Sequence, residues 1–187
     1  MVPPPAQRRL GPDDYAQPAP VLAPALLGKF LCRKRGRRVI RLRITETEAY
    51  YGEADTACHA RRGKTRRTAV MYQSGGYAYV YLCYGVHWML NVVTGQEGFP
   101  EAALIRGVEG FDGPGKLTRA LGISKALNGE NLAESGRLWI EDDGFQPVCR
   151  AGRRVGIDYA SETDRNRLWR FTALEKAASL SAPQGSV

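Results

Sequence analysis

The sequence predicts a single compact α+β domain with a curved, mostly antiparallel sheet, flanking helices and a protruding β-hairpin. Two observations predict this class. Most strand-like runs are short and follow one another closely, as in hairpins, whereas the few helical patterns are separate from them. In addition, a chain of 187 residues is long enough to bury one hydrophobic core, and it contains no internal repeat.

Proline density indicates where this domain begins. Seven of the eleven prolines lie within the first 24 residues, which predicts a flexible arm over residues 1–20. We expect the folded domain over residues 21–180 and a short tail over residues 181–187.

The domain is expected to open with a helix and a strand. The segment "APALLGKFLCR" has apolar residues at helical spacing, and Pro24 suits a first helical turn. The next segment, "RVIRLRITETEAY", alternates as a strand does. One parity of this strand is occupied by Ile40, Leu42, Ile44, Glu46, Glu48 and Tyr50. A long basic connection, "CHARRGKTRRTAVMYQSGG", follows.

The stretch "YAYVYLCYGVHWMLNVV" over residues 77–93 predicts the protruding hairpin. A three-residue connection over residues 84–86, with Gly85 in the left-handed conformation, is a common hairpin solution. The register that follows pairs Cys83 with His87, Tyr81 with Met89 and Tyr79 with Asn91. The tyrosines, His87 and Asn91 then share one face, and the core face carries Val80, Leu82, Trp88, Leu90 and Val92.

Tyr84 at the hairpin tip is unusual, because small polar residues are typical of tight turns. A tyrosine-rich face is often no more than a half-buried sheet. An exposed aromatic tip on a basic protein, however, is typical of a wedge that enters a duplex between base steps. The aromatic face behind it suits stacking of a base that has left the helix.

The remaining elements are expected to be short. A buried strand is predicted in "EAALIRGVEG" and an amphipathic helix in "GPGKLTRALGISKALNGENL". Three further short strands are predicted in "GRLWIEDD", "RRVGIDYA" and "RLWRFTAL".

Composition narrows the class of function. Lys and Arg number 27 against 19 Asp and Glu, and the net charge of +8 favours a polyanion as partner. The four cysteines are scattered without a C-x-x-C pair, which indicates free thiols in a reducing compartment. No apolar run approaches the length of a membrane span. We therefore expect a cytoplasmic protein without membrane association, metal or cofactor.

Two carboxylates on the strand parity described above require an explanation, since burial of an unpaired charge is costly. Glu46 and Glu48 either form structural ion pairs or include a general base beside Tyr50. Arg106, at the end of "AALIR", is a candidate partner that would hold the pKa of such a carboxylate low.

The basic connection begins with His59, one of two histidines in the chain. A lone histidine is more often structural than catalytic, but this one is close in sequence to the acidic strand. Five of the next seven residues that follow Ala60 are basic, among them Arg61, Lys64 and Arg67. Such a run is either solvated surface or a grip on DNA phosphates.

Taken together, these segments resemble the alkyladenine (methylpurine) DNA glycosylase family. The resemblance is carried by "LLGKFLCR", "ITETEAYYGEADTACHARRGKTRRTAVMY", "YAYVYLCYGVHWMLNVV", "ALIRGVEG", "GPGKL" and "RRVGIDY", in family order over roughly residues 21–172. No single segment is specific, but their combination is.

The resemblance implies the residues of the reaction. Glu48 would be the general base, and Arg106 would help to hold the attacking water. A backbone carbonyl near residues 155–157 would be a further contact of that water.

The resemblance also implies how the base is held. Tyr50 and His59 would sandwich a flipped purine, and Tyr81 would close the pocket edge-on. Asn91 would discriminate against the N2 amine of normal guanine, and Tyr84 would fill the space that the extruded nucleotide leaves.

Two positions depart from the family pattern. Thr68 stands where family members commonly have Asn, and "RGVEG" replaces the more usual "RAxEP" after Arg106. The first puts the role of the basic loop in doubt, and the second puts in doubt how the strand ends.

The expected function is therefore that of a monofunctional DNA glycosylase acting as a monomer on double-stranded DNA. It would hydrolyse the N-glycosidic bond of an alkylated or deaminated purine, such as 3-methyladenine, 7-methylguanine, hypoxanthine or ethenoadenine. No lysine is placed as a Schiff-base nucleophile, so water is the expected nucleophile and strand cleavage is not expected.

Two other classes remain open on the sequence. A non-catalytic nucleic-acid module would use the aromatic residues to stack single strands, although carboxylates in a groove would repel phosphate. A metal-dependent hydrolase would use His59 and His87, although their spacing matches no familiar ligand motif.

Overall fold

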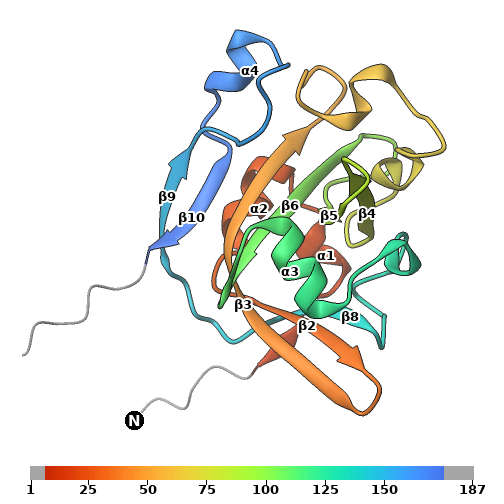
Figure 1. The fold of residues 1–187 in the computed structure, drawn as a ribbon, viewed down its shortest axis with the longest axis vertical. Coiled ribbons are helices and arrows are strands. Elements are labelled where there is room, and N and C mark those ends of the chain that lie inside the picture. Colours follow the sequence, from red (N-terminus) through yellow and green to blue (C-terminus); the bar gives the residue numbers. More distant parts are fainter. Residues whose placement is uncertain (1–6, 175–187) are drawn as a thin grey trace, which may run out of the picture.

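The computed structural model describes residues 7–174, which form the α+β domain with an antiparallel sheet that the sequence predicts (Figure 1). In this described part of the chain, ten strands pair in the order β1-β8-β2-β3-β6-β5-β4, with β10 beside β3 and β9, and β7 beside β6. The strand bounds are β1 Arg8–Arg9, β2 Phe30–Arg35, β3 Arg38–Tyr51, β4 Ala78–Cys83, β5 His87–Val93, β6 Glu101–Val108, β7 Phe111–Asp112, β8 Leu138–Asp142, β9 Val148–Gly152 and β10 Arg170–Leu174.

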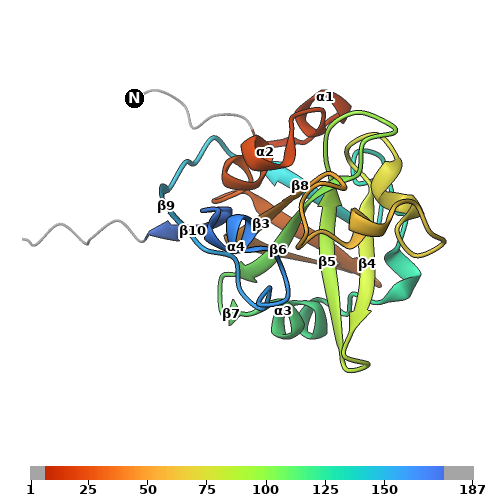
Figure 2. The same cartoon turned by 90° about the horizontal axis from the view of Figure 1, so that it is seen from above.

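Within residues 7–174, four α-helices accompany the sheet, and α2 and α3 pack against its core face. Figure 2 shows α2 and α3 near opposite ends of strand β5. The helices are α1 Pro12–Tyr15, α2 Ala19–Ala25, α3 Pro114–Leu121 and α4 Glu162–Asn166, and short 3₁₀ turns span His59–Arg62, Ala69–Tyr72 and Lys125–Leu127. No helix in the described part of the chain is long and apolar enough to cross a bilayer.

The N-terminal segment is folded, so the predicted flexible arm is wrong for residues 7–20. Strand β1 pairs with β8, and the side chains of Leu10 and Tyr15 are buried in the core. Pro12 occupies the first turn of α1, where the proline lacks only an N–H that a helix start leaves unpaired. Proline density in this segment therefore marks helix starts rather than disorder. The rest of the predicted arm (residues 1–6) and the predicted tail lie outside the described residues.

The segment predicted as the first helix is divided by a glycine. Helix α2 begins after Pro18, and Pro24 lies in its last turn rather than its first. Gly28 has a φ of +81°, and a Cβ there would lie 2.7 Å from the Pro147 ring, so the chain leaves the helix where only glycine fits. The residues that follow form β2.

The strand predicted in "RRVGIDYA" is also wrong in position. Strand β9 ends at Gly152, and residues 153–160 form an irregular loop. Gly156 has a φ of +73°, which interrupts an extended conformation. The other predicted strands are present, and the four cysteines are free.

Two β-bulges, one in β3 and one in β6, determine which side chains of these strands face the core and which face the opposite side of the sheet. The pairing runs from Ile44–Val108 through Glu46–Gly107 to Thr47–Ile105, so it skips Thr45 on one strand and Arg106 on the other. A bulge reverses the side-chain alternation beyond it. A Cβ on Gly107 would lie 3.0 Å from the Thr45 hydroxyl, so the "RG" departure from the family pattern fits this crowded site.

The bulges correct the predicted face of β3. Ile44 lies in the core, but beyond the bulge Thr47 and Ala49 face the core instead. Glu46, Glu48 and Tyr50 therefore point to the opposite side of the sheet, and the expected continuous parity from Ile40 to Tyr50 is interrupted.

Candidate active site

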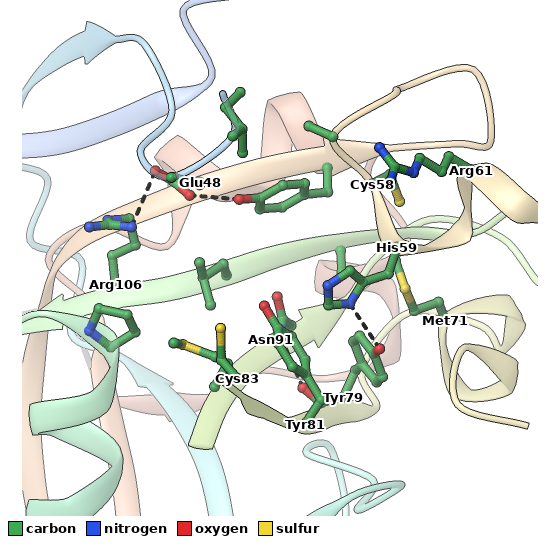
Figure 3. A pocket seen from close by; sticks show the side chains of 18 of the residues that line it. Glu48, Cys58, His59, Arg61, Met71, Tyr79, Tyr81, Cys83, Asn91 and Arg106 are labelled. Atoms are coloured by element: carbon green, nitrogen blue, oxygen red, sulfur yellow. Dashed lines mark hydrogen bonds and ion pairs between the residues drawn. The ribbon is translucent and has the colours of Figure 1, made fainter. Parts of the chain in front are cut away.

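A hollow of about 630 Å³ lies on the face of the sheet opposite the core (Figure 3). Its floor comes from β3, β4, β5 and β6, and its walls come from the loops around residues 57–67 and 155–159. Nine of the ten residues predicted for the site line it, and Lys64 is the exception. The nine are Glu48, Tyr50, His59, Arg61, Arg67, Tyr81, Tyr84, Asn91 and Arg106.

Glu48 lies at the closed end of the hollow, and its side chain is fully buried. Its Oε1 accepts a hydrogen bond from the backbone N–H of Val155 at 2.8 Å, and its Oε2 accepts one from the Tyr50 hydroxyl at 2.8 Å. The guanidinium Nη1 of Arg106 lies 3.5 Å from Oε1. A carboxylate has about four lone-pair sites, so Glu48 keeps capacity to bind a water molecule.

Burial raises the pKa of Glu48 above the ordinary glutamate value. Arg106, the Val155 N–H and the Tyr50 hydroxyl act in the opposite direction, and the nearby Glu46 adds to the increase. The expectation that Arg106 would hold this pKa low is therefore wrong, because removal of the carboxylate from water outweighs the attraction. A carboxylate with a raised pKa is a stronger base than one in water.

Glu46 and Arg170 complete a cluster of charges around Arg106. The Glu46 Oε1 lies 3.5 Å from Arg106 Nε and 3.6 Å from Arg170 Nη1. Arg170 is brought there because β10 pairs with β3, with Arg170 directly opposite Glu48. Glu46 thus supplies an ion pair, and Arg106 contacts the carboxylates of both Glu46 and Glu48.

A buried ion pair behind Tyr50 was not predicted from the sequence. Arg154 donates to both carboxylate oxygens of Asp55, at 2.6 and 2.9 Å, and to the backbone oxygen of Ala49 at 3.0 Å. Both charged side chains are essentially inaccessible to solvent. The Arg154 guanidinium lies 4.9 Å from the centre of the Tyr50 ring. This pair therefore fixes the ring and holds the loop that carries the Val155 N–H.

His59 and two tyrosines form the opposite wall of the hollow (Figure 3). The His59 Nδ1 lies 3.1 Å from the Tyr79 hydroxyl, and its ring packs edge-on against Tyr81 with centroids 4.4 Å apart. Burial, together with the charges of Arg67 and Arg61, lowers the pKa of His59 to about 4. The imidazole is therefore neutral at neutral pH.

Asn91 lies on the floor of the hollow, opposite Tyr79 in the hairpin register. Its side-chain amide donates to the backbone oxygen of Tyr79 at 3.0 Å, which fixes the orientation of the group. All three cross-strand pairs of the predicted hairpin register are confirmed.

Comparison with known proteins identifies the family. The family description "Methylpurine-DNA glycosylase" matches residues 13–112 and 109–177. The DNA-3-methyladenine glycosylase of Arabidopsis thaliana is 41% identical over 204 aligned residues, which cover 97% of this chain and 78% of that protein. The chain belongs to the methylpurine-DNA glycosylase family.

Bacterial proteins that carry the provisional name 3-methyladenine DNA glycosylase are similarly close. One from Psychrobacter cryohalolentis is 42% identical, covering 81% of this chain and 85% of that protein. One from Borrelia garinii subsp. bavariensis is 44% identical, covering 84% of this chain and 91% of that protein. The hollow is accordingly the candidate active site of a DNA glycosylase, a hydrolase in the repair of alkylated bases.

The hairpin tip of this glycosylase is held in a demanding conformation. Tyr84 has a φ of +49° and Gly85 a φ of +70°, and the Val86 N–H donates to the Cys83 oxygen at 3.1 Å. Positive φ at both central residues is typical of the tight turns that suit hairpins, although it is rare for a tyrosine. The Tyr84 side chain is 90% exposed, so the turn presents the ring to solvent.

The basic loop of the glycosylase is closed by Thr68, one of the two departures from the family pattern. The buried Thr68 hydroxyl accepts from the Thr65 N–H at 2.9 Å and donates to the Gly63 oxygen at 3.2 Å. These bonds connect Gly63 and Thr65 to Thr68 and so close the loop between them. Arg61, Lys64 and Arg67 are left exposed around it.

Two of these cations also make cation–π contacts with aromatic rings at the rim of the hollow. The Arg61 guanidinium lies 4.8 Å from the Tyr159 ring centre and donates to the Thr56 oxygen at 2.8 Å. The Arg67 guanidinium lies 5.2 Å from the Tyr81 ring centre. Tyr159 was not predicted as a site residue, and it reaches the rim through the loop that replaces the expected strand.

Within residues 7–174, no three His, Cys, Asp or Glu side chains gather in a way that suits a metal ion. His59 and His87, the ligands that a metal-dependent hydrolase would require, do not share a site: His59 lines the hollow and contacts Tyr79, whereas His87 is not among the lining residues and packs against Gly115 at the start of α3.

Proposed function

We propose that this glycosylase receives a flipped, damaged purine in the hollow and hydrolyses its N-glycosidic bond with a water molecule activated by Glu48. The observation that carries the proposal is the buried carboxylate of Glu48 at the closed end of an aromatic-walled hollow. Arg106 at 3.5 Å is suited to orient the same water.

In the proposed step the water oxygen bonds to C1′ of the sugar, and the bond from C1′ to the base nitrogen breaks. The electron pair of that bond leaves with the base, and the proton of the water passes to Glu48. Positive charge that develops on the sugar is stabilised by the carboxylate. The product is an abasic site and a free base. Among the described residues that line the hollow there is no lysine, which favours water as the nucleophile and argues against strand cleavage.

Among its described lining residues the hollow offers a base but no acid suited to neutral pH, and this affects which lesions can be released. His59 is neutral because its pKa is about 4, and the Tyr50 hydroxyl, whose pKa is raised by burial and by Glu48, already donates to that carboxylate. A purine nucleotide alkylated on N3 or N7 carries a positive charge on the base, which therefore leaves without protonation. Cationic alkylpurines such as 3-methyladenine and 7-methylguanine are therefore the proposed substrates, with hypoxanthine and ethenoadenine released more slowly.

The test is base release from a panel of duplexes, each with one lesion. Free 3-methyladenine or 7-methylguanine is expected to appear faster than hypoxanthine, and the product strand is expected to stay intact until alkali is added. A non-catalytic nucleic-acid module would instead release no base from any duplex and would prefer single strands. Release of hypoxanthine as fast as the cationic bases would contradict the proposed substrate class.

The ionisation of Glu48 predicts a pH dependence. The rate of a single turnover is expected to fall with acidification, and its midpoint is expected above the ordinary glutamate pKa of 4.5, because burial raises the pKa of this group. Replacement of Arg106 by glutamine removes a charge that lowers this pKa, so the midpoint is expected to move to still higher pH. Single-turnover rates of both proteins across the acid range check this. An unchanged midpoint would contradict the prediction that the charge of Arg106 lowers the pKa of Glu48.

Replacement of Tyr84 by alanine is expected to weaken binding of lesion duplex by about 5- to 150-fold, as base–aromatic stacking contributes about 1–3 kcal/mol per base. The physical reason is that the exposed ring is proposed to fill the gap that the flipped nucleotide leaves. The matched control is Val86→Ala, which shortens an exposed apolar side chain at the same tip. Equal affinities of the two variants would contradict the wedge.

A further inference from the structure

We infer that the turn of the β2–β3 hairpin is a second binding site for the phosphate backbone of duplex DNA, separate from the lesion hollow. Five of the six residues from Arg33 to Arg38 are basic, and the sixth is Gly36. The inference goes beyond the proposed reaction and rests only on duplex DNA as the substrate.

The hairpin turn concentrates these charges. Gly36 has a φ of +59° and Arg35 pairs directly with Arg38 across the two-residue connection, as in a tight hairpin turn with glycine at its first position. Like charges directly opposite each other destabilise a hairpin. The arrangement therefore costs folding stability, which a bound polyanion would offset.

The acids of this region are committed to other cations. Glu141, Asp142 and Asp143 pair with Arg41, Lys29 and Arg43, and Glu130 pairs with Arg137. Within residues 7–174, none of the five hairpin cations has an ion-pair partner. Their charge is thus available to a ligand.

Four residues of this turn and two residues that precede β8 line a shallow hollow of about 550 Å³. In the described chain its lining consists of cations and glycines, namely Arg33, Lys34, Arg35, Gly36, Gly136 and Arg137. Arg33 donates to the backbone oxygens of Lys34 and Arg137, at 2.8 and 3.1 Å, while its Nε has no partner among the described residues. Burial and the charges of Arg137 and Arg35 lower the pKa of Arg33, which reflects the crowding of cations.

The position of the hairpin separates it from the lesion hollow. Strand β3 carries Arg38 near the turn and Glu48 in the hollow, ten residues apart, which is about 33 Å along an extended strand. From Lys34 onward, β2 pairs only with β3 in the sheet, so the turn projects (bottom of Figure 1). The β4–β5 hairpin that carries Tyr84 projects in a different direction (Figure 2).

The DNA phosphate backbone bound at this site has two possible sources, and a comparison of a short with a long duplex distinguishes them. A lesion-centred duplex of about 12 base pairs reaches roughly 20 Å to each side, at about 3.4 Å per pair, and does not span the distance to the turn. One of about 40 base pairs reaches roughly 70 Å and does. Binding of the long duplex alone indicates the flank of the same DNA, whereas binding of two short duplexes at once indicates a second segment.

The test compares Arg35→Gln/Arg37→Gln with Arg150→Gln/Arg165→Gln, which has the same net charge. The control residues are exposed on β9 and α4, away from the hairpin (Figure 1). Affinity for the long duplex is measured as a function of salt concentration, and sedimentation detects a complex with two short duplexes. If the site binds the flank of the same DNA, the hairpin variant is expected to lower the magnitude of the slope of log affinity against log salt concentration by about 1.8, at about 0.9 per phosphate contact. If the site binds a second segment, the variant is expected to abolish the two-duplex complex.

Two results would overturn the inference. One is a hairpin variant that matches the control variant in both measurements. The other is a slower release of base from the short lesion duplex, which would place the hairpin at the lesion itself. Failure of the wild-type protein to release base would count against the proposed reaction instead, and the binding measurements would still decide the hairpin site.

Discussion

Replacement of Glu48 by glutamine is expected to lower the rate of base release by about 10²- to 10⁴-fold, the contribution typical of a positioned general base. Glutamine matches the shape of glutamate but does not accept the proton of the attacking water. Duplex binding is expected to persist, because Glu48 is buried below the surface that faces the DNA. Single-turnover release and binding of the same lesion duplex are the two measurements.

The stability of this variant provides an internal control. Because burial raises the pKa of Glu48, the ionised carboxylate opposes folding at neutral pH. A neutral side chain removes that cost, so the variant is expected to unfold no more easily than the wild type. Glu46→Gln alters the neighbouring carboxylate on the same face and is expected to have a far smaller effect on the rate. Release by Glu48→Gln at the wild-type rate would exclude Glu48 as the base.

Replacement of Arg154 by leucine is expected to lower the free energy of unfolding by about 3 to 5 kcal/mol, because it leaves the carboxylate of Asp55 buried without its partner. For a domain of this size the melting temperature is expected to fall by roughly 10 °C. Arg154→Lys keeps the charge but not the two-pronged contact, so an intermediate loss is expected. Thermal and urea unfolding measure these differences.

The neighbouring residue gives the matched control. Arg153 is exposed and has no ion-pair partner in the described chain, so Arg153→Leu is expected to change stability by less than about 0.5 kcal/mol. If Arg154→Leu proves as stable as Arg153→Leu, the buried pair does not hold the loop and the Tyr50 ring in the way that the contacts indicate.

The hairpin shows what local sequence can determine. Alternation along residues 77–93 and the single glycine at position 85 were enough to predict the register of Tyr79 with Asn91. Both signals lie within the hairpin itself. The exposure of Tyr84 also follows from its place in the turn, although its own left-handed conformation does not.

The face of β3 shows what local sequence cannot determine. The alternation from Ile40 to Tyr50 predicts one continuous face, but the bulges at Thr45 and Arg106 exist only where β3 meets β6. The prediction of a flexible N-terminal arm is wrong for a related reason. Its prolines indicate disorder in isolation, and only the core explains why Leu10 and Tyr15 hold the segment in place.

The Asp55–Arg154 pair and the pKa of Glu48 depend on tertiary structure alone. The two charged residues are 99 positions apart, and each looks like an ordinary loop residue in the sequence. Similarly, Arg106 near Glu48 predicts a low pKa until the depth of burial is known. The sequence motifs therefore predict which residues line the hollow, but the pKa values and ion pairs of the hollow depend on how the chain packs.

The skipped residues in β3 and β6 also make chain length a constraint. Loss of Thr45 alone would place Glu46 directly after Ile44, so the alternation would run without a bulge and Glu48 would still face the hollow. Loss of Thr47, beyond the bulge, would instead move every later side chain of β3 to the other face, so that Ala49 would face the hollow and the Glu48 carboxylate would enter the apolar interior. Homologues are therefore expected to tolerate a gap at Thr45 far more readily than a gap between Glu46 and Glu48.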